Sequence, residues 1–247
     1  MAVFIKERAV VLLSGGLDSA TAAAWGAANQ FELFALTIDY NQRHRCELNA
    51  ARRVGEFLKV SRHVFLDVNL AAFGGSSLTS NAIEVRHDVP LETIGREIPN
   101  TYVPARNTVF LSLALAYAET ISAEHIILGI NAADYSGYPD CRPEYLDAFA
   151  NMARLATKAG VEGTLQLQFH APLMTLGKRE IIELGISLGV DFSLTHTCYS
   201  PSTDGKSCGR CEACLLRLKG FHEAGITDPI VYGSELSVGS RDSSPHL

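Results

Sequence analysis

Residues 14–19, Ser-Gly-Gly-Leu-Asp-Ser, have the types and spacing of a site that binds phosphate groups. The glycines let backbone N–H groups approach an anion without a Cβ in the way. The helix expected to begin at Asp18 adds free donors and a partial positive charge. Since Asp18 would repel a bare pyrophosphate, we expect a Mg²⁺ ion beside it. The predicted phosphate-binding residues are Leu13, Ser14, Gly15, Gly16, Leu17, Asp18 and Ser19.

This loop differs from a Walker A motif because it lacks the lysine that reaches the β- and γ-phosphates. The alternative is an ordinary glycine-rich turn between a strand and a helix. An apolar run at residues 10–13 precedes the loop and a helix start follows it. This order favours phosphate binding.

Four of the six cysteines lie close together in the sequence, at Cys198, Cys208, Cys211 and Cys214. Four thiolates at this spacing predict a closed tetrahedral Zn²⁺ site, which leaves no position for a substrate and is therefore structural. An iron–sulfur cluster uses the same ligands, and a redox pair at Cys211 and Cys214 is a further alternative. Cys46 and Cys141 are isolated and are expected to be small packed side chains.

An α/β domain is expected to position these groups, because apolar runs alternate with amphipathic segments. We expect strands at residues 9–13, 33–38, 63–68, 125–130 and 165–171, and helices at 18–29, 44–59, 108–120, 143–159, 178–188 and 212–223. Two loops, 69–107 and 131–142, are longer than a connection requires, and such loops usually carry function.

The composition is that of a globular protein: 247 residues, 47% hydrophobic and 19% charged. A formal net charge of −6 argues against a protein that grips long nucleic acid, so a small-molecule substrate is favoured. No apolar run approaches the ~20 residues of a membrane span, and residues 1–8 lack a signal-peptide pattern. We therefore expect a cytoplasmic protein without a membrane partner.

The loop resembles the SGGxDS loop of the PP-loop ATP pyrophosphatases. That resemblance implies that residues 13–19 bind ATP, which is cleaved between the α- and β-phosphates to give an adenylated substrate. Other stretches resemble one family of that superfamily, the QueC family of queuosine biosynthesis. They are YNQRH at 40–44, VPARN at 103–107, NAADYSGYPDCRPEY at 131–145 and APLMTLGK at 171–178, together with the four cysteines.

The family resemblance implies a Rossmann-like, adenine nucleotide α-hydrolase-like parallel sheet with helices on both faces and a small zinc-binding helical appendage. We expect a nucleotide-binding domain at residues 1–190, a zinc-binding region at 191–232 and a mobile tail at 233–247. The implied activity is that of a ligase that forms C–N bonds. It converts 7-carboxy-7-deazaguanine and ammonia, with ATP, to 7-cyano-7-deazaguanine. One structural Zn²⁺ per subunit, Mg²⁺ with the ATP, and a homodimer without direct nucleic-acid contact are also implied.

Conversion of a carboxylate to a nitrile requires the loss of two oxygen atoms, the first from the acid and the second from the amide. Adenylation of the acid supplies AMP as a leaving group for attack by ammonia, and a second adenylation on the amide oxygen would allow the nitrile to form. Charge in both transition states needs fixed positive partners. The candidates are Arg43, His44, Arg106 and Lys178, each of which could instead be a solvated surface residue.

The loop at 131–142 offers rings and carboxylates that suit the flat face and the N–H groups of a deazaguanine. The candidate substrate residues there are Asp134, Tyr135, Tyr138, Asp140 and Arg142. We expect Asp134 or Asp140 to contact the guanine-like edge. The alternative is that these residues only build a rigid turn.

Three competing functions stay open. A PP-loop enzyme that modifies tRNA would act on a macromolecule, which the acidic total and the absence of an added domain argue against. A relative that acts on a protein or another carboxylic acid is compatible with the sequence. A nucleotide-binding module without turnover would keep the glycines but would need no site for an acyl acceptor.

Overall fold

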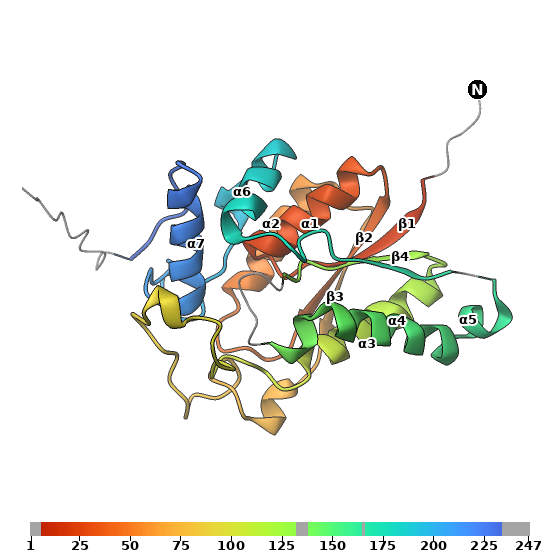
Figure 1. The fold of residues 1–247 in the computed structure, drawn as a ribbon, viewed down its shortest axis with the longest axis horizontal. Coiled ribbons are helices and arrows are strands. Elements are labelled where there is room, and N and C mark those ends of the chain that lie inside the picture. Colours follow the sequence, from red (N-terminus) through yellow and green to blue (C-terminus); the bar gives the residue numbers. More distant parts are fainter. Residues whose placement is uncertain (1–5, 132–137, 165, 234–247) are drawn as a thin grey trace, which may run out of the picture.

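The computed structural model describes residues 6–131, 138–164 and 166–233. Its centre is a parallel sheet with the strand order β3-β2-β1-β4-β5 (Figure 1). The strands are β1 (Arg8–Leu12), β2 (Glu32–Asp39), β3 (Arg62–Asp67), β4 (His125–Ile127) and β5 (Gln168–His170). This order confirms the predicted Rossmann-like class. It reverses direction at the β1–β4 pair, and such a switch point is where open α/β sheets bind ligands.

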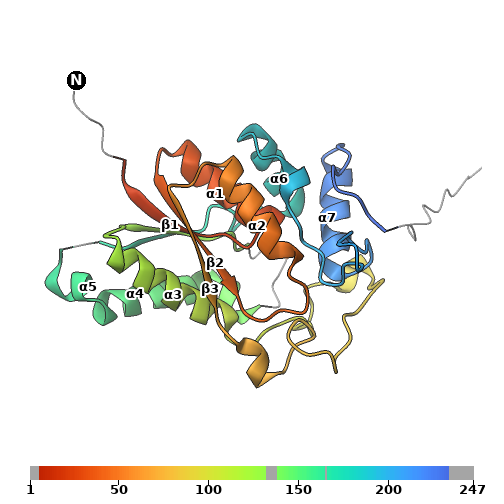
Figure 2. The ribbon, with the colours of Figure 1, turned by 180° about the vertical axis from the view of Figure 1, so that it is seen from behind.

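Helices cover both faces of the sheet, as the opposite views of Figures 1 and 2 show. One face carries α1 (Leu17–Ala28), α2 (Cys46–Phe57) and α6 (Lys178–Ser187). The other carries α3 (Arg106–Thr120), α4 (Pro143–Ala156) and α5 (Lys158–Glu162). Beyond α6 stands α7 (Glu212–Glu223), which packs against α6. No helix in the described ranges is long and apolar enough to cross a membrane.

The core lies on both sides of β1. Ala9 and Val11 pack toward α1, α2 and α6, together with Ile181, and Val10 packs on the other side with Leu111 of α3. All five side chains are buried. A strand buried on both faces reads as a continuous apolar run, which is why β1 was predictable.

The predicted helix at 143–159 is divided into α4 and α5 at Thr157. That residue is extended, with φ −108° and ψ 148°, and its hydroxyl accepts a hydrogen bond from the N–H of Gly160. The single long helix was therefore wrong, because Thr157 acts as an N-cap. The helix expected from His44 begins at Cys46, and the strand expected at 125–130 ends at Ile127.

The segment after α7 is held by a buried ion pair. Arg217 donates from Nε to Oδ2 of Asp228 at 2.7 Å, and the hydroxyl of Tyr232 donates to the same oxygen at 2.6 Å. The Arg217 and Asp228 side chains are only 1% and 5% exposed. These bonds fix residues 226–233 on α7, next to the cysteine cluster.

Candidate active site

The loop between β1 and α1 holds its two serine hydroxyls together. Ser19 Oγ donates to the carbonyl of Gly16 at 3.1 Å and lies 3.0 Å from Ser14 Oγ. Ser14 Oγ in turn accepts from the N–H of Gly16 at 3.2 Å. The hydroxyls therefore stand at the N-terminus of α1, where free N–H groups and the helix dipole favour an anion.

Gly15 adopts φ +87° and lies directly against α2. A Cβ at this position would be 2.4 Å from the N atom of Ala51 and 2.4 Å from the carbonyl oxygen of Glu47. On the other side, the carbonyl of Gly15 accepts from the N–H of His196 at 2.9 Å. Only glycine fits both the conformation and the space.

Asp18 and Lys178 form an ion pair at the edge of this loop. Lys178 Nζ donates to both carboxylate oxygens of Asp18 at 2.8 Å, and Asn131 Nδ2 donates to Oδ2 at 3.3 Å. The Lys178 side chain is 11% exposed. The pair brings a cation to the phosphate loop and offsets the acidic charge there. A Mg²⁺ ion bound at Asp18 would share the carboxylate with Lys178.

A cavity of about 260 Å³ opens in front of the loop, at the carboxyl ends of β1, β2 and β4. Predicted ATP-binding residues that line it are Leu13, Ser14, Gly16, Leu17, Asp18 and Ser19. Three substrate candidates, Arg106, Asp140 and Lys178, line it too. Residues far apart in the sequence therefore meet at the switch point of the sheet, where a ligand is expected.

Arg106 begins α3 and contributes a fixed positive charge to the cavity. Its guanidinium lies 5.9 Å from the ring centroid of Tyr40 and 5.8 Å from that of Phe110. Contacts of this kind stabilise a cation and hold its orientation. This placement agrees with the predicted role as a partner for developing negative charge, which stays a prediction.

Asp140 lines the cavity and also supports the start of α3. Its Oδ2 accepts from the backbone N–H of Asn107 at 3.0 Å. Tyr138 is buried, with its hydroxyl 3.0 Å from Thr101 Oγ1. Their predicted contact with the deazaguanine, by Asp140 at its edge and by Tyr138 at its ring, stays a prediction. Asp134 and Tyr135 lie outside the described residues.

Arg43, His44 and Arg142 do not line the cavity. Arg43 Nη1 donates to the carbonyls of Ser77 and Ile83 at 3.4 and 3.3 Å, so it supports the long loop after β3. Burial and the neighbouring Arg43 charge lower the pKa of His44. Arg142 is exposed and donates to a backbone carbonyl nearby. Their proposed contact with the reacting groups stays a prediction.

Other cavity residues were missed by the sequence analysis, among them Tyr40, Glu47, Thr197, Tyr199 and Arg217. Burial raises the pKa of Glu47 to about 7, although the Arg106 charge acts in the opposite direction. Burial and the Glu47 carboxylate raise the pKa of Tyr40 above its usual range. Glu47 could have been found from its position in the sequence. It lies three residues after the YNQRH stretch, in the first turn of a helix that follows a strand.

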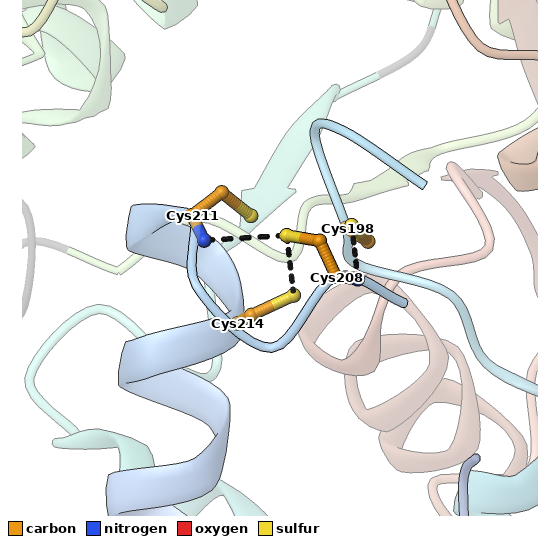
Figure 3. Close-up of side chains that lie close together, drawn as sticks. All are labelled: Cys198, Cys208, Cys211 and Cys214. Atoms are coloured by element: carbon orange, nitrogen blue, oxygen red, sulfur yellow. Dashed lines mark hydrogen bonds between the residues drawn. The ribbon is translucent and has the colours of Figure 1, made fainter. Parts of the chain in front are cut away.

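The four predicted metal ligands converge between the start of α7 and the adjoining loop (Figure 3). The sulfur atoms of Cys198, Cys208, Cys211 and Cys214 lie within 4.8 Å of one another. Backbone N–H groups donate to these sulfurs, for example Cys208 to Cys198 Sγ at 3.1 Å and Cys211 to Cys208 Sγ at 3.3 Å. The cluster can hold a metal ion.

Comparison with known proteins gives the family. Residues 8–225 match the family described as "Queuosine biosynthesis protein QueC". The 7-cyano-7-deazaguanine synthase of Desulfatibacillum aliphaticivorans is 56% identical over 227 residues, 92% of this chain and 97% of that protein. The synthase of Kineococcus radiotolerans is 55% identical over 224 residues, 91% of this chain and 97% of that protein.

A solved structure, the NMN synthetase of Francisella tularensis, is 19% identical and covers 91% of this chain and 79% of that chain. Its TM-score of 0.45 is too low to support an inference. The sequence matches, by contrast, run through almost all of the described structure, including the phosphate loop and the cysteine cluster. The chain belongs to the QueC family of queuosine biosynthesis proteins.

Proposed function

We propose that this protein is an ATP-dependent ligase that converts 7-carboxy-7-deazaguanine and ammonia to 7-cyano-7-deazaguanine, the product after which its relatives are named. One observation carries the proposal. The phosphate loop, the Lys178 ammonium and the Arg106 guanidinium line one cavity at the switch point of the sheet. That cavity offers donors for a triphosphate and fixed positive charge for an acyl adenylate.

Adenylation begins when the loop and Lys178 hold the β- and γ-phosphates, with Mg²⁺ as the counterion of ATP. A carboxylate oxygen of the deazaguanine attacks the α-phosphorus, and pyrophosphate leaves. Ammonia then displaces AMP to give the amide. The amide oxygen attacks a second ATP in the same way, and loss of AMP with two protons gives the nitrile.

Arg106, at the start of α3, would orient the reacting acid in the cavity. Arg106 is held over two aromatic rings, so its charge is fixed before the substrate arrives. Fixed charge needs no reorganisation as the phosphoryl oxygens become more negative. We assign recognition of the deazaguanine edge to Asp140 or Asp134, with Tyr138 and Tyr135 as candidate ring partners.

Zinc is the ion we assign to the four cysteines. Four sulfurs with N–H donors around them suit a tetrahedral thiolate site, whose role is to cross-link the chain. The bound ion would hold the start of α7. That helix contributes Ala213, Leu216 and Arg217 to the cavity wall, so the ion would also support the substrate site.

The remaining assignments are also proposals. We divide the chain into a nucleotide-binding domain at 1–190, a zinc-binding region at 191–232 and a tail at 233–247. We further propose a cytoplasmic homodimer with one Zn²⁺ per subunit. It acts on small molecules and makes no direct contact with nucleic acid.

Incubation with ATP, Mg²⁺, ammonium and 7-carboxy-7-deazaguanine tests the activity directly, with products followed by mass spectrometry. We expect the amide to form first and the nitrile to follow. Pyrophosphate release that needs no added carboxylate would indicate a different role. A shift of tRNA in a gel at moderate salt would support the competing tRNA-modifying class.

A further inference from the structure

We propose that Glu47 is the general base of the amide-forming step and takes a proton from ammonia as it adds to the adenylated acid. This inference rests on the proposed function and adds to it a residue that acts after adenylation. It is carried by the place of Glu47 in the cavity and by its carboxylate, which makes no hydrogen bond or ion pair with any residue that the structure describes.

The backbone of Glu47 is fixed relative to the phosphate loop. Glu47 lies in the first turn of α2, and its carbonyl oxygen would be 2.4 Å from a Cβ at Gly15. Its side chain lines the same cavity as Ser14 and Asp18. A residue packed this closely against the loop keeps its position when the phosphates bind.

Among the residues that the structure describes, three acidic side chains line the cavity, and two of them already have partners. Asp18 is paired with Lys178, and Asp140 accepts from the N–H of Asn107. Within the described ranges, the Glu47 carboxylate makes no hydrogen bond and no ion pair. A half-buried carboxylate that faces a ligand cavity without a partner is available to a proton of the ligand.

The surroundings of Glu47 adjust its basicity. Burial raises its pKa to about 7, and the Arg106 charge opposes that rise. A base that titrates near neutral pH is deprotonated often enough to accept a proton and protonated easily enough to release it. Other ionisable groups on the walls around it are Asp18, Tyr40, Arg43, His44, Arg106, Asp140, Lys178, Cys198, Tyr199 and Arg217.

Amide formation proceeds by addition of ammonia to the acyl carbon and elimination of AMP. The nitrogen lone pair of ammonia forms the C–N bond, and the carbonyl π pair moves to oxygen. Glu47 accepts one N–H proton from the resulting ammonium group. The oxyanion then re-forms the C=O bond, and the C–O bond to AMP breaks with its electron pair on the leaving phosphate. The amide remains, and Glu47 returns its proton to solvent.

Glu47→Gln, Glu47→Asp and Glu56→Gln test this assignment. Glu56 is an exposed glutamate on the same helix, so its variant is the matched control. Two acceptors are compared: ammonium, and hydroxylamine, which is largely unprotonated at neutral pH and less dependent on a base. With ammonium we expect Glu47→Gln to slow amide and nitrile formation about 100- to 10,000-fold. Formation of the hydroxamate should stay within a few-fold of wild type, which also shows that the variant is folded.

The pH profile separates a base from a positioning group. When kcat/KM is calculated for free NH₃ at each pH, the wild-type value should rise with pH and level off above about 7, because the deprotonated carboxylate is the active form. Glu47→Gln should lose that rise, and Glu47→Asp should regain it with a lower plateau.

Three results would overturn the inference. An equal loss of rate with ammonium and with hydroxylamine would mean that Glu47 acts in adenylation. A raised KM for the deazaguanine with unchanged kcat would mean that Glu47 binds the deazaguanine ring. Behaviour equal to that of Glu56→Gln would remove any role. Wild-type protein that forms no nitrile would instead overturn the proposed function.

Discussion

The ammonium of Lys178 lies 2.8 Å from both carboxylate oxygens of Asp18, a contact between residues 160 positions apart in the chain. It joins the first residue of α6 to the first turn of α1. The loop that we propose to bind the phosphates of ATP therefore has a cation beside it. Two stretches that were singled out separately in the sequence therefore meet at one cavity.

Lys178→Ala should leave the Asp18 carboxylate without its cation, facing an incoming triphosphate. Truncating one member of a close charge pair costs about 2–5 kcal/mol. We expect KM for ATP to rise about 30-fold or more, because each 1.4 kcal/mol is about tenfold. Lys59→Ala, at an exposed residue, is the control. An unchanged KM for ATP in Lys178→Ala would show that the pair is not part of the ATP site.

Gly15→Ala should destabilise the protein and impair ATP binding. The left-handed conformation costs about 1–2 kcal/mol for a residue with a Cβ, and overlap with α2 adds about 1–3 kcal/mol. Gly163→Ala is a matched control, because that glycine has φ +64° but open space around it. Urea unfolding should separate the two variants. Equal losses would mean that contact with α2 does not constrain the loop.

Cys208→Ser should remove the bound metal and unfold the region around α7. Elemental analysis of the purified wild-type protein is expected to give one zinc per chain. Binding of structural zinc contributes about 10–16 kcal/mol in small peptides, so its loss should lower Tm strongly. Cys46→Ser, outside the cluster, should retain the metal. Iron with sulfide in the wild type would instead support the iron–sulfur alternative.

Asp228→Ala should cost about 3–5 kcal/mol in the free energy of unfolding, because it leaves Arg217 charged and buried. The control is Glu223→Ala, since Glu223 pairs with Lys219 at 3.8 Å with both side chains about half exposed. That change should cost less than about 1 kcal/mol. Similar losses in the two variants would mean that water reaches the Arg217–Asp228 pair.

Groups that are contiguous in sequence were predictable from their chemistry. The loop at 14–19 and the four cysteines are each recognisable from the spacing of their residues. The strand β1 is recognisable from its apolar run, because it is buried on both faces. The break at Thr157 was missed because the residues on both sides form helices, and only the Thr157 cap divides them.

Side-chain direction was harder to predict. Arg43 and His44 follow β2, as ligand-binding residues often do, but the long loop after β3 packs there and Arg43 turns to its carbonyls. Glu47 lines the cavity, and its helix α2 packs against Gly15 of the loop. Neither fact is encoded locally, since both depend on segments that are distant in sequence.

The most direct test of two adenylations at one loop is the nucleotide count per nitrile. AMP, ADP, pyrophosphate and phosphate should be measured together with the nitrile, from labelled ATP in a single reaction. The proposed mechanism predicts two AMP and two pyrophosphate for each nitrile formed, with the amide appearing after the first. Nitrile accompanied only by ADP and phosphate would contradict it.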